Sequence, residues 1–148
     1  MYRISRCEDR DMEEVAEVEA ACFPEAPWDA GYLKKELKDN PFAVFLRLDD
    51  EEGIQAYLQY AVTFDSSTIY RLGVKPESRR KGYAKALLDA MENSFKDYPE
   101  RVSTSTLEVE EGNKAAIALY ESRGYVLATR KKGYYGGKKD ALYMVKGL

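Results

Sequence analysis

The feature that most constrains this chain is a short basic turn between a strand-like segment and a helix-like one. The turn runs over residues 79–84 and reads Arg-Arg-Lys-Gly-Tyr-Ala. Residues 68–74 before it are typical of a strand, and residues 82–96 after it carry apolar side chains at helical spacing. A helix N-terminus offers unpaired N–H groups and partial positive charge, which suit a phosphate. The small residues Gly82 and Ala84 let a ligand approach the backbone. The sequence therefore predicts an anion site here, or a solvated basic connection.

Two common phosphate-binding motifs are excluded at this turn. No Gly-Lys-Ser/Thr follows it, so it is not a Walker A loop, and GxGxxG is missing, so it is not a dinucleotide fingerprint. The ligand, if the turn binds one, belongs to another class.

Periodicity and turn residues predict one mixed α+β domain over residues 1–148. Strands are expected at residues 2–6, 42–48, 54–64, 68–74, 104–109, 125–130 and 141–146, and helices at 12–20, 30–39, 82–96 and 114–123. Asp9 and Asn113 are the expected N-caps of the first and last helices. Gly124 is the expected stop of the last helix.

The chain contains no histidine and two cysteines. The missing histidine removes Ser-His-Asp and Cys-His chemistry. Two cysteines are too few for a four-thiolate zinc site, so we expect no metal. Cys7 and Cys22 form no motif, and we expect both to be buried free thiols.

The net charge of −3 is unevenly distributed. Residues 1–60 hold 15 acids and 7 bases, whereas residues 125–148 hold one acid and six bases. The basic end can meet an anionic ligand or an acidic substrate, or it can be a solvated surface. The overall acidity argues against nucleic acid as the main partner. Without a long apolar run, we expect a cytoplasmic protein with no membrane partner.

A second motif lies downstream and, with the first, carries a resemblance to a known family. Arg79, Gly82 and Ala84 match the Gln/Arg-x-x-Gly-x-Gly/Ala coenzyme motif of the GNAT superfamily of N-acetyltransferases. Residues 107–109, then Asn113, then residues 116–125 resemble that superfamily's second signature. Within the superfamily the chain looks closest to N-terminal protein acetyltransferases, both the ribosomal-protein-alanine type and archaeal relatives. The matches that support this are Phe23-Pro24, Pro27-Trp28, Tyr134-Tyr135, Asp140-Ala141 and Met144.

The resemblance implies a mixed, mostly antiparallel seven-stranded sheet, flanked by about four helices and splayed between its fourth and fifth strands. It implies acetyl-CoA as the co-substrate, with pantetheine in the split. The residues so assigned to the coenzyme are Leu72, Gly73 and Val74 through their backbone, and Arg79, Arg80, Lys81, Gly82, Tyr83, Ala84 and Lys85 around the pyrophosphate. Asn113 and Tyr120 are further coenzyme contacts, although capping of the last helix alone also explains Asn113.

Two side chains are the candidate catalytic residues. Glu108 alternates with Leu107 and Val109 on its strand, and its family counterpart is the proton acceptor. Tyr120 lies in the last helix, and its counterpart donates a proton to the coenzyme sulfur. A tyrosine with a pKa near 10 is protonated at neutral pH and can reprotonate a thiolate. The structural alternatives are a surface glutamate and a core tyrosine.

The acceptor site is also implied by the resemblance. Phe23, Pro24 and Trp28 would form one wall, and Tyr134 and Tyr135, in a loop from Lys131 to Asp140, would bind the peptide backbone. The loop is short and basic where relatives carry acidic residues, so we expect a preference for acidic residues downstream of the acetylated one.

Three alternatives remain open for the function. The first is the N-terminal α-amine of a protein or peptide. A small amine such as a polyamine, or a lysine side chain, is the second, and the acidic front half would suit a polycation. A non-catalytic coenzyme-A-binding module is the third, and the presence of both Glu108 and Tyr120 speaks against it. A monomer or a weak dimer is expected.

Overall fold

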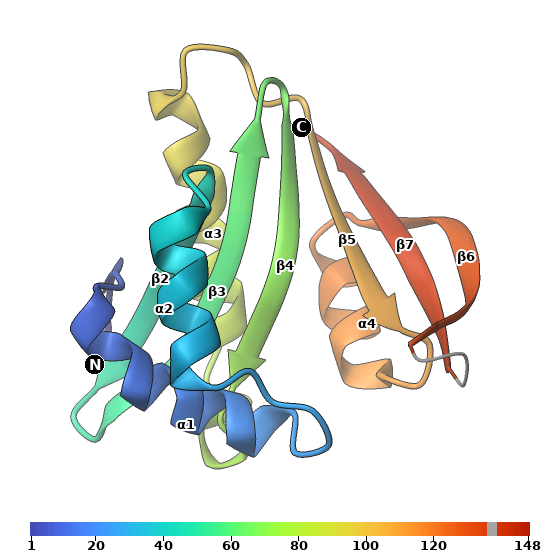
Figure 1. Ribbon diagram of the computed structural model, residues 1–148. Coiled ribbons are helices and arrows are strands. Elements are labelled where there is room, and N and C mark those ends of the chain that lie inside the picture. Colours follow the sequence, from blue (N-terminus) through green and yellow to red (C-terminus); the bar gives the residue numbers. More distant parts are fainter. Residues whose placement is uncertain (136–138) are drawn as a thin grey trace.

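A single twisted sheet organises the computed structural model, which describes residues 1–135 and 139–148 (Figure 1). The strand order is β1-β2-β3-β4-β5-β7-β6. The strands are β1 (Arg3–Arg6), β2 (Ala43–Asp50), β3 (Gly53–Thr63), β4 (Ser66–Val74), β5 (Thr104–Glu110), β6 (Val126–Tyr135) and β7 (Lys139–Gly147). The helices are α1 (Met12–Cys22), α2 (Ala30–Asp39), α3 (Tyr83–Ser94) and α4 (Lys114–Ser122). Helices α1 and α2 cover one face, and α3 and α4 cover the other (Figure 1).

The sheet is mixed, as the sequence predicts. Strands β4 and β5 are parallel, and the other neighbouring pairs are antiparallel. The β4–β5 ladder runs from Ser66 opposite Thr104 to Ile69 opposite Leu107 and ends there. Beyond Ile69, β4 stays paired only with β3, and beyond Leu107, β5 stays paired only with β7. The expected split between the fourth and fifth strands is confirmed.

A β-bulge lies at the point where the two strands separate. Arg71 pairs with Gln59 and Ile69 pairs with Tyr60, so Tyr70 is an extra residue on β4. A bulge increases the local twist and bends the strand that carries it. The bend turns the second half of β4 away from β5 and opens the split.

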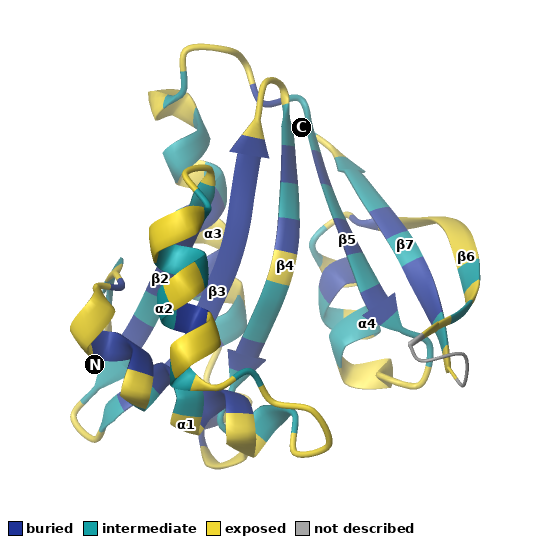
Figure 2. Ribbon diagram, in the orientation of Figure 1, coloured by how far each residue is buried: buried dark blue, intermediate teal, exposed yellow. Residues whose placement is uncertain are grey.

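Two apolar cores, one on each face, fix the sheet. The larger includes Leu58, Tyr60, Leu87, Leu88 and Met91, which join the sheet to α3. The smaller gathers α1 and α2 side chains over Phe45 and Tyr57. Strand β3 is buried along nearly its whole length because it lies under both layers (Figure 2).

The helix ends differ from the sequence prediction at two places. Asp9 is not a cap; it begins a one-turn 3₁₀ helix (Asp9–Asp11), and the Glu8 amide donates to Asp11 Oδ2 at 2.7 Å. Helix α3 begins at Tyr83, one residue after Gly82, and passes into a 3₁₀ turn at Phe95. Asn113 caps α4 as expected, since its Oδ1 accepts from the Ala116 amide at 3.2 Å. Gly124 ends that helix at a φ of +96°.

Most of the expected loop from Lys131 to Asp140 is strand. Strand β6 continues to Tyr135, and β7 begins at Lys139, where the two residues pair. The prediction of a long loop was wrong because cross-strand pairing, which the local sequence does not reveal, extends both strands. The middle of the expected basic stretch, residues 136–138, lies outside the described residues. No described helix is long and apolar enough to cross a membrane.

Candidate active site at the sheet split

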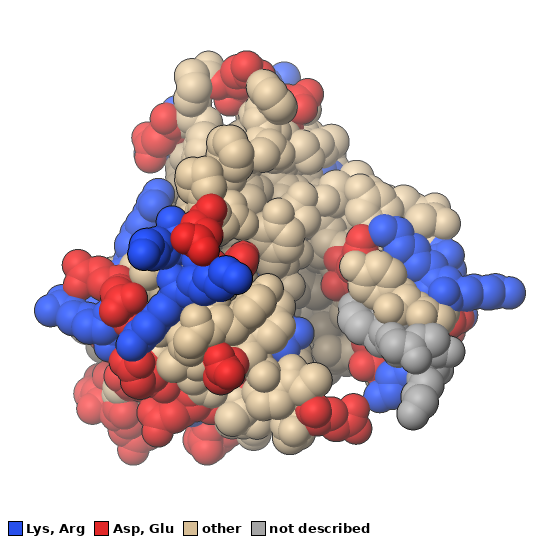
Figure 3. Space-filling model, in the orientation of Figure 1, with Lys and Arg blue, Asp and Glu red and all other residues tan. Residues whose placement is uncertain are grey.

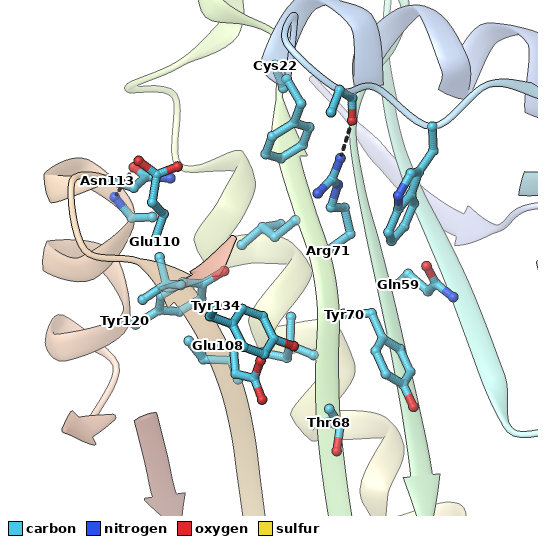
Figure 4. A pocket seen from close by; sticks show the side chains of 18 of the residues that line it. Cys22, Gln59, Thr68, Tyr70, Arg71, Glu108, Glu110, Asn113, Tyr120 and Tyr134 are labelled. Atoms are coloured by element: carbon cyan, nitrogen blue, oxygen red, sulfur yellow. Dashed lines mark hydrogen bonds between the residues drawn. The ribbon is translucent and has the colours of Figure 1, made fainter. Parts of the chain in front are cut away.

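A cavity of about 1070 Å³ lies where β4 and β5 separate (Figure 4). Its walls come from the α1–α2 connection, β4, β5, the start of α4 and the β6–β7 hairpin. The hollow is visible between the α1–α2 side and the β6–β7 side of the surface, and basic side chains gather over β6 (Figure 3). The split thus leaves a space that two separate parts of the chain enclose.

Glu108 enters this cavity from β5. Leu107 and Val109 are buried in the core, while Glu108 is only partly buried and faces the other way, as the alternation predicts. Its Oε1 accepts from Lys131 Nζ at 2.6 Å. Its Oε2 is buried and has no hydrogen-bond partner among the described residues. The carboxylate is therefore held at Oε1, on the Lys131 side.

The surroundings of Glu108 favour its ionised form. Burial on its own raises the pKa of the carboxyl group, but hydrogen bonding by Lys131 and Tyr134 and the charge of Lys131 outweigh it. The pKa of Glu108 consequently lies below its ordinary value of 4.5. Glu108 is a carboxylate at neutral pH, which is the form that can take a proton.

Tyr120 reaches the same cavity from α4. The side chain is buried, and its ring packs edge-on against Tyr125 with the centroids 5.7 Å apart. The structure thus brings the two sequence-predicted catalytic side chains, Glu108 and Tyr120, to one cavity from different elements. Both the core role and an active-site role of Tyr120 are compatible with this position.

The predicted phosphate turn has the backbone that an anion site needs. Gly82 precedes α3 with a φ of +80°, and a Cβ built on it would meet no atom within 4 Å. The first backbone bond of the helix runs from Ala86 N–H to Gly82 O at 3.0 Å, so the amides of residues 83–85 precede the helical ladder. No side chain within the described chain caps this end. The turn is therefore an open helix N-terminus and not a closed connection.

A second pocket, of about 320 Å³, lies in front of that helix end. Its lining includes Val74, Ser78, Arg79, Arg80, Gly82, Ala84 and Lys85. Arg80 has a φ of +66°, a left-handed conformation that costs free energy for a residue with a side chain. Tyr83 also lines this pocket, and its hydroxyl donates to Asp50 Oδ2 at 2.9 Å. The residues present fit a pyrophosphate group held by backbone amides and cations.

The second half of β4 connects this pocket with the cavity. The Val74 carbonyl accepts from Cys22 Sγ at 3.1 Å and from Arg79 Nε at 3.0 Å, so both donors occupy a group expected to contact pantetheine. A Cβ on Gly73 would lie 3.2 Å from Cys22 Sγ, and glycine is what lets the end of α1 lie against the strand. Cys7 is buried as expected, but Cys22 is only half-buried and lines the cavity.

The predicted acceptor wall is held by an ion pair that the sequence did not reveal. Arg71 on β4 donates from Nε and Nη2 to the two oxygens of Glu19, at 2.8 and 2.9 Å. Its guanidinium lies 3.8 Å from the centre of the Phe23 ring and 4.3 Å from the Trp28 ring. The Trp28 amide also donates to Glu19, at 2.9 Å. These contacts fix the residues 23–28 segment, including Pro24, on the cavity rim.

The opposite wall is the β6–β7 hairpin. Tyr134 lines the cavity beside Glu108 (Figure 4), and the Glu108 carboxylate raises the pKa of the Tyr134 hydroxyl. Tyr135 lies at the end of β6, and its side chain is outside the described residues. Lys139 is 3.6 Å from Glu25 and 3.5 Å from Glu110, so its charge is balanced by two glutamates on the opposite walls.

Sequence reasoning missed Glu19, Arg71 and Lys131, although one signal was present. Glu19 follows Met12 and Val15 at helical spacing on the apolar face of α1, where a charged residue requires a buried partner. Arg71 similarly interrupts an apolar strand. Among the described residues, no group of three or more His, Cys, Asp or Glu side chains is placed to hold a metal ion.

Comparisons with known proteins agree with this geometry. Residues 7–125 match the model of the acetyltransferase (GNAT) family. The chain is 32% identical to the [ribosomal protein bS18]-alanine N-acetyltransferase of Haemophilus ducreyi, over 92% of this chain and 93% of that protein. It is 29% identical to an N-alpha-acetyltransferase of Saccharolobus solfataricus, over 93% and 88% of the two chains. The crystal structure of the ribosomal-protein-S18-alanine N-acetyltransferase from Escherichia coli superposes with a TM-score of 0.87 at 29% identity, covering 100% of this chain and 94% of that one.

Proposed function

The chain belongs to the GNAT family of acetyltransferases, and on that basis we propose that it acetylates the N-terminal α-amine of a protein. Acetyl-CoA is the acetyl donor. The acceptor class is supported by the relatives, which are similar over nearly the whole chain and are named as acting on protein N-termini. The observation that carries the proposal is that Glu108 and Tyr120 line one cavity at the split between β4 and β5.

Two pockets would hold the donor. The pyrophosphate would lie at the α3 N-terminus, on the amides of residues 80–85 and beside Arg79, and the pantetheine arm along Leu72, Gly73 and Val74. The acetyl thioester would then reach the cavity that Glu108 lines. Asn113, at the start of α4, would bond the coenzyme in addition to its capping role.

Glu108 and Tyr120 would divide the proton transfers. The neutral amine attacks the thioester carbonyl, so that a C–N bond forms and the C–S bond breaks. Glu108, directly or through a water, takes the proton that leaves the nitrogen. Tyr120 gives its hydroxyl proton to the departing sulfur. The lowered pKa of Glu108 makes it a weak base, which suits an acceptor amine that is readily deprotonated.

An α-amine is such an acceptor. Its pKa is about 7.7–8.0, so on the order of a tenth is already neutral at pH 7, against fewer than about one in a thousand lysine side chains. A carboxylate can complete deprotonation of the first far more readily than of the second. The chemistry of the site therefore favours N-terminal acceptors over lysine.

The acceptor class is tested with three substrates and one enzyme. Acetyl-CoA is incubated with a peptide that has a free N-terminus, with the same peptide N-terminally blocked but carrying a lysine, and with a polyamine. Mass spectrometry locates the acetyl group. We expect acetylation of the free α-amine; transfer only to the lysine or the polyamine would contradict the proposal.

The role of Glu108 is tested by Glu108→Gln. We expect kcat to fall by roughly 100-fold, with the largest loss at low pH, where fewer amines are neutral. The matched control is Glu111→Gln, which removes the same charge from a residue that pairs with Arg130 and is not among the described residues lining the cavity. Equal rates in both variants would remove Glu108 from the mechanism.

A further inference from the structure

The ion pair between Glu108 and Lys131 links strand β5 to strand β6 beside the cavity. Glu108 lines the cavity, whereas Lys131 is not among the described residues that do. The Lys131 side chain keeps 41% of its surface exposed and that of Glu108 keeps 25%, with the two charged atoms 2.6 Å apart. Lys131 thus contacts the carboxylate from the β6 side of the sheet.

The position of the Lys131 ammonium is set by three groups. Strand β7 lies between β5 and β6, so the Lys131 side chain must cross a strand to reach Glu108. Neighbouring strands are about 4.8 Å apart, and the crossing therefore spans roughly 10 Å. Tyr143, the β7 partner of Glu108, lies along this path, with its ring centre 5.1 Å from Nζ. The Tyr134 ring lies 5.4 Å from the same atom.

We propose that Lys131 is a positioning residue for acetyl transfer, which holds the Glu108 carboxylate through Oε1 at the cavity that Glu108 lines. This inference rests on the proposed function, in which Glu108 takes the proton. Oε2 is buried and has no hydrogen-bond partner among the described residues, so the contact from Lys131 to Oε1 fixes the direction of the carboxylate. A carboxylate gripped at one oxygen keeps the other in a defined direction.

The ion pair with Lys131 also favours the ionised form of Glu108. The groups that contact the carboxylate are Lys131 and Tyr134 from β6. Other titratable groups line the same cavity from the elements around it, among them Tyr143 and Lys139 from β7, Tyr70 from β4, Tyr120 from α4 and Glu110 from β5. Of the two β6 groups that lower the pKa of Glu108, Lys131 contributes more than Tyr134. Its removal leaves burial to dominate, so the pKa of Glu108 rises and its ionised fraction at mildly acidic pH falls.

The test compares Lys131→Met with Lys131→Arg and with Lys132→Met in the full-length enzyme. Met keeps the length of the side chain without its charge, and Arg restores the charge. Lys132 is the next residue on β6, is exposed, and by strand alternation points to the other face. Lys132→Met removes the same net charge as Lys131→Met, so it is the matched control. Each variant is assayed for kcat against pH at saturating peptide and acetyl-CoA, and the Glu108 carboxyl is titrated by ¹³C NMR. Circular dichroism confirms folding.

We expect Lys131→Met to raise the pKa of Glu108 and to lower kcat, with the largest loss at the acidic end of the pH profile and recovery as the pH rises. Lys131→Arg and Lys132→Met should stay within about twofold of the parent enzyme. In the Glu108→Gln background, Lys131→Met should have no further effect, because the two residues act as one unit.

An unchanged Glu108 titration or an unchanged pH profile in Lys131→Met would overturn the inference. So would a loss of the same size in the Glu108→Gln background, since Lys131 would then act elsewhere. The proposed function is judged separately. A fully active Glu108→Gln enzyme defeats the role of the base, and that result is read without any Lys131 variant.

Discussion

Arg71 and Glu19 form a two-pronged ion pair that joins β4 to α1 beside the split of the sheet. Nε and Nη2 of Arg71 lie 2.8 and 2.9 Å from the two oxygens of Glu19, whose side chain has no exposed surface. The Tyr57 hydroxyl donates to the same carboxylate. Because Phe23 and Trp28 pack on the guanidinium, the pair connects the strand proposed to bind the coenzyme to the wall proposed to bind the acceptor.

Removal of Arg71 should therefore be costly. Arg71→Met leaves a buried carboxylate without its cation, and we expect a loss of about 3–5 kcal/mol in the free energy of unfolding. The KM for the acceptor should also rise, because the residues 23–28 wall loses its anchor. Urea denaturation and steady-state kinetics measure the two effects. The Glu19→Gln/Arg71→Met double variant should lose less than the sum of the single changes; strict additivity would mean that the pair is not coupled.

Gly82 should be required for its backbone conformation. Gly82→Ala places a side chain at a φ of +80° but into open space, so we expect about 1–2 kcal/mol of destabilisation. The affinity for acetyl-CoA should fall roughly tenfold as the turn relaxes. Gly147→Ala is the matched control, since its Cβ also meets nothing and its φ is not positive. Calorimetric titration with acetyl-CoA that gives equal affinities for the two variants would contradict the assignment.

Tyr120→Phe should lower kcat roughly 10- to 100-fold with little change in the affinity for acetyl-CoA. The ring and its packing are kept, and only the proton donor is lost. Tyr125→Phe is the control, because this buried neighbour places its hydroxyl 2.6 Å from Ser105 Oγ. That variant should lose about 1 kcal/mol of stability and keep its kcat. Equal kcat values in the two variants would leave Tyr120 as a core residue.

The KM for the acceptor peptide should depend modestly on the charge of that peptide. The basic β6–β7 hairpin leads us to expect a lower KM for peptides with acidic residues downstream of the acetylated one. The structure limits the size of the effect, because Lys139 already lies near Glu25 and Glu110. A two- to fivefold difference that fades at high salt is expected. Equal KM values for acidic and basic peptides with the same first residue would exclude this preference.

The order of the elements and the main features of the proposed coenzyme site follow from the sequence. The basic turn before a helix, the Asn113 cap and the Gly124 stop are local patterns, because each depends on neighbours within about one helical turn. The alternation that turns Glu108 away from the core is local too. The mixed α+β class was therefore predictable from local patterns, whereas the split of the sheet was implied by the resemblance to a known family.

Only the tertiary structure decided how the site is held. Arg71 and Glu19 are 52 positions apart, and Lys131 and Glu108 are 23 apart, so no local pattern pairs them. The bulge at Tyr70 depends on the register between β3 and β4. Sequence fixes the period and ends of a segment through short-range sterics and hydrogen bonds. Contacts between distant charges and the register of strands depend on how the whole sheet packs, and that packing brings Lys131 to Glu108 and Arg71 to Glu19.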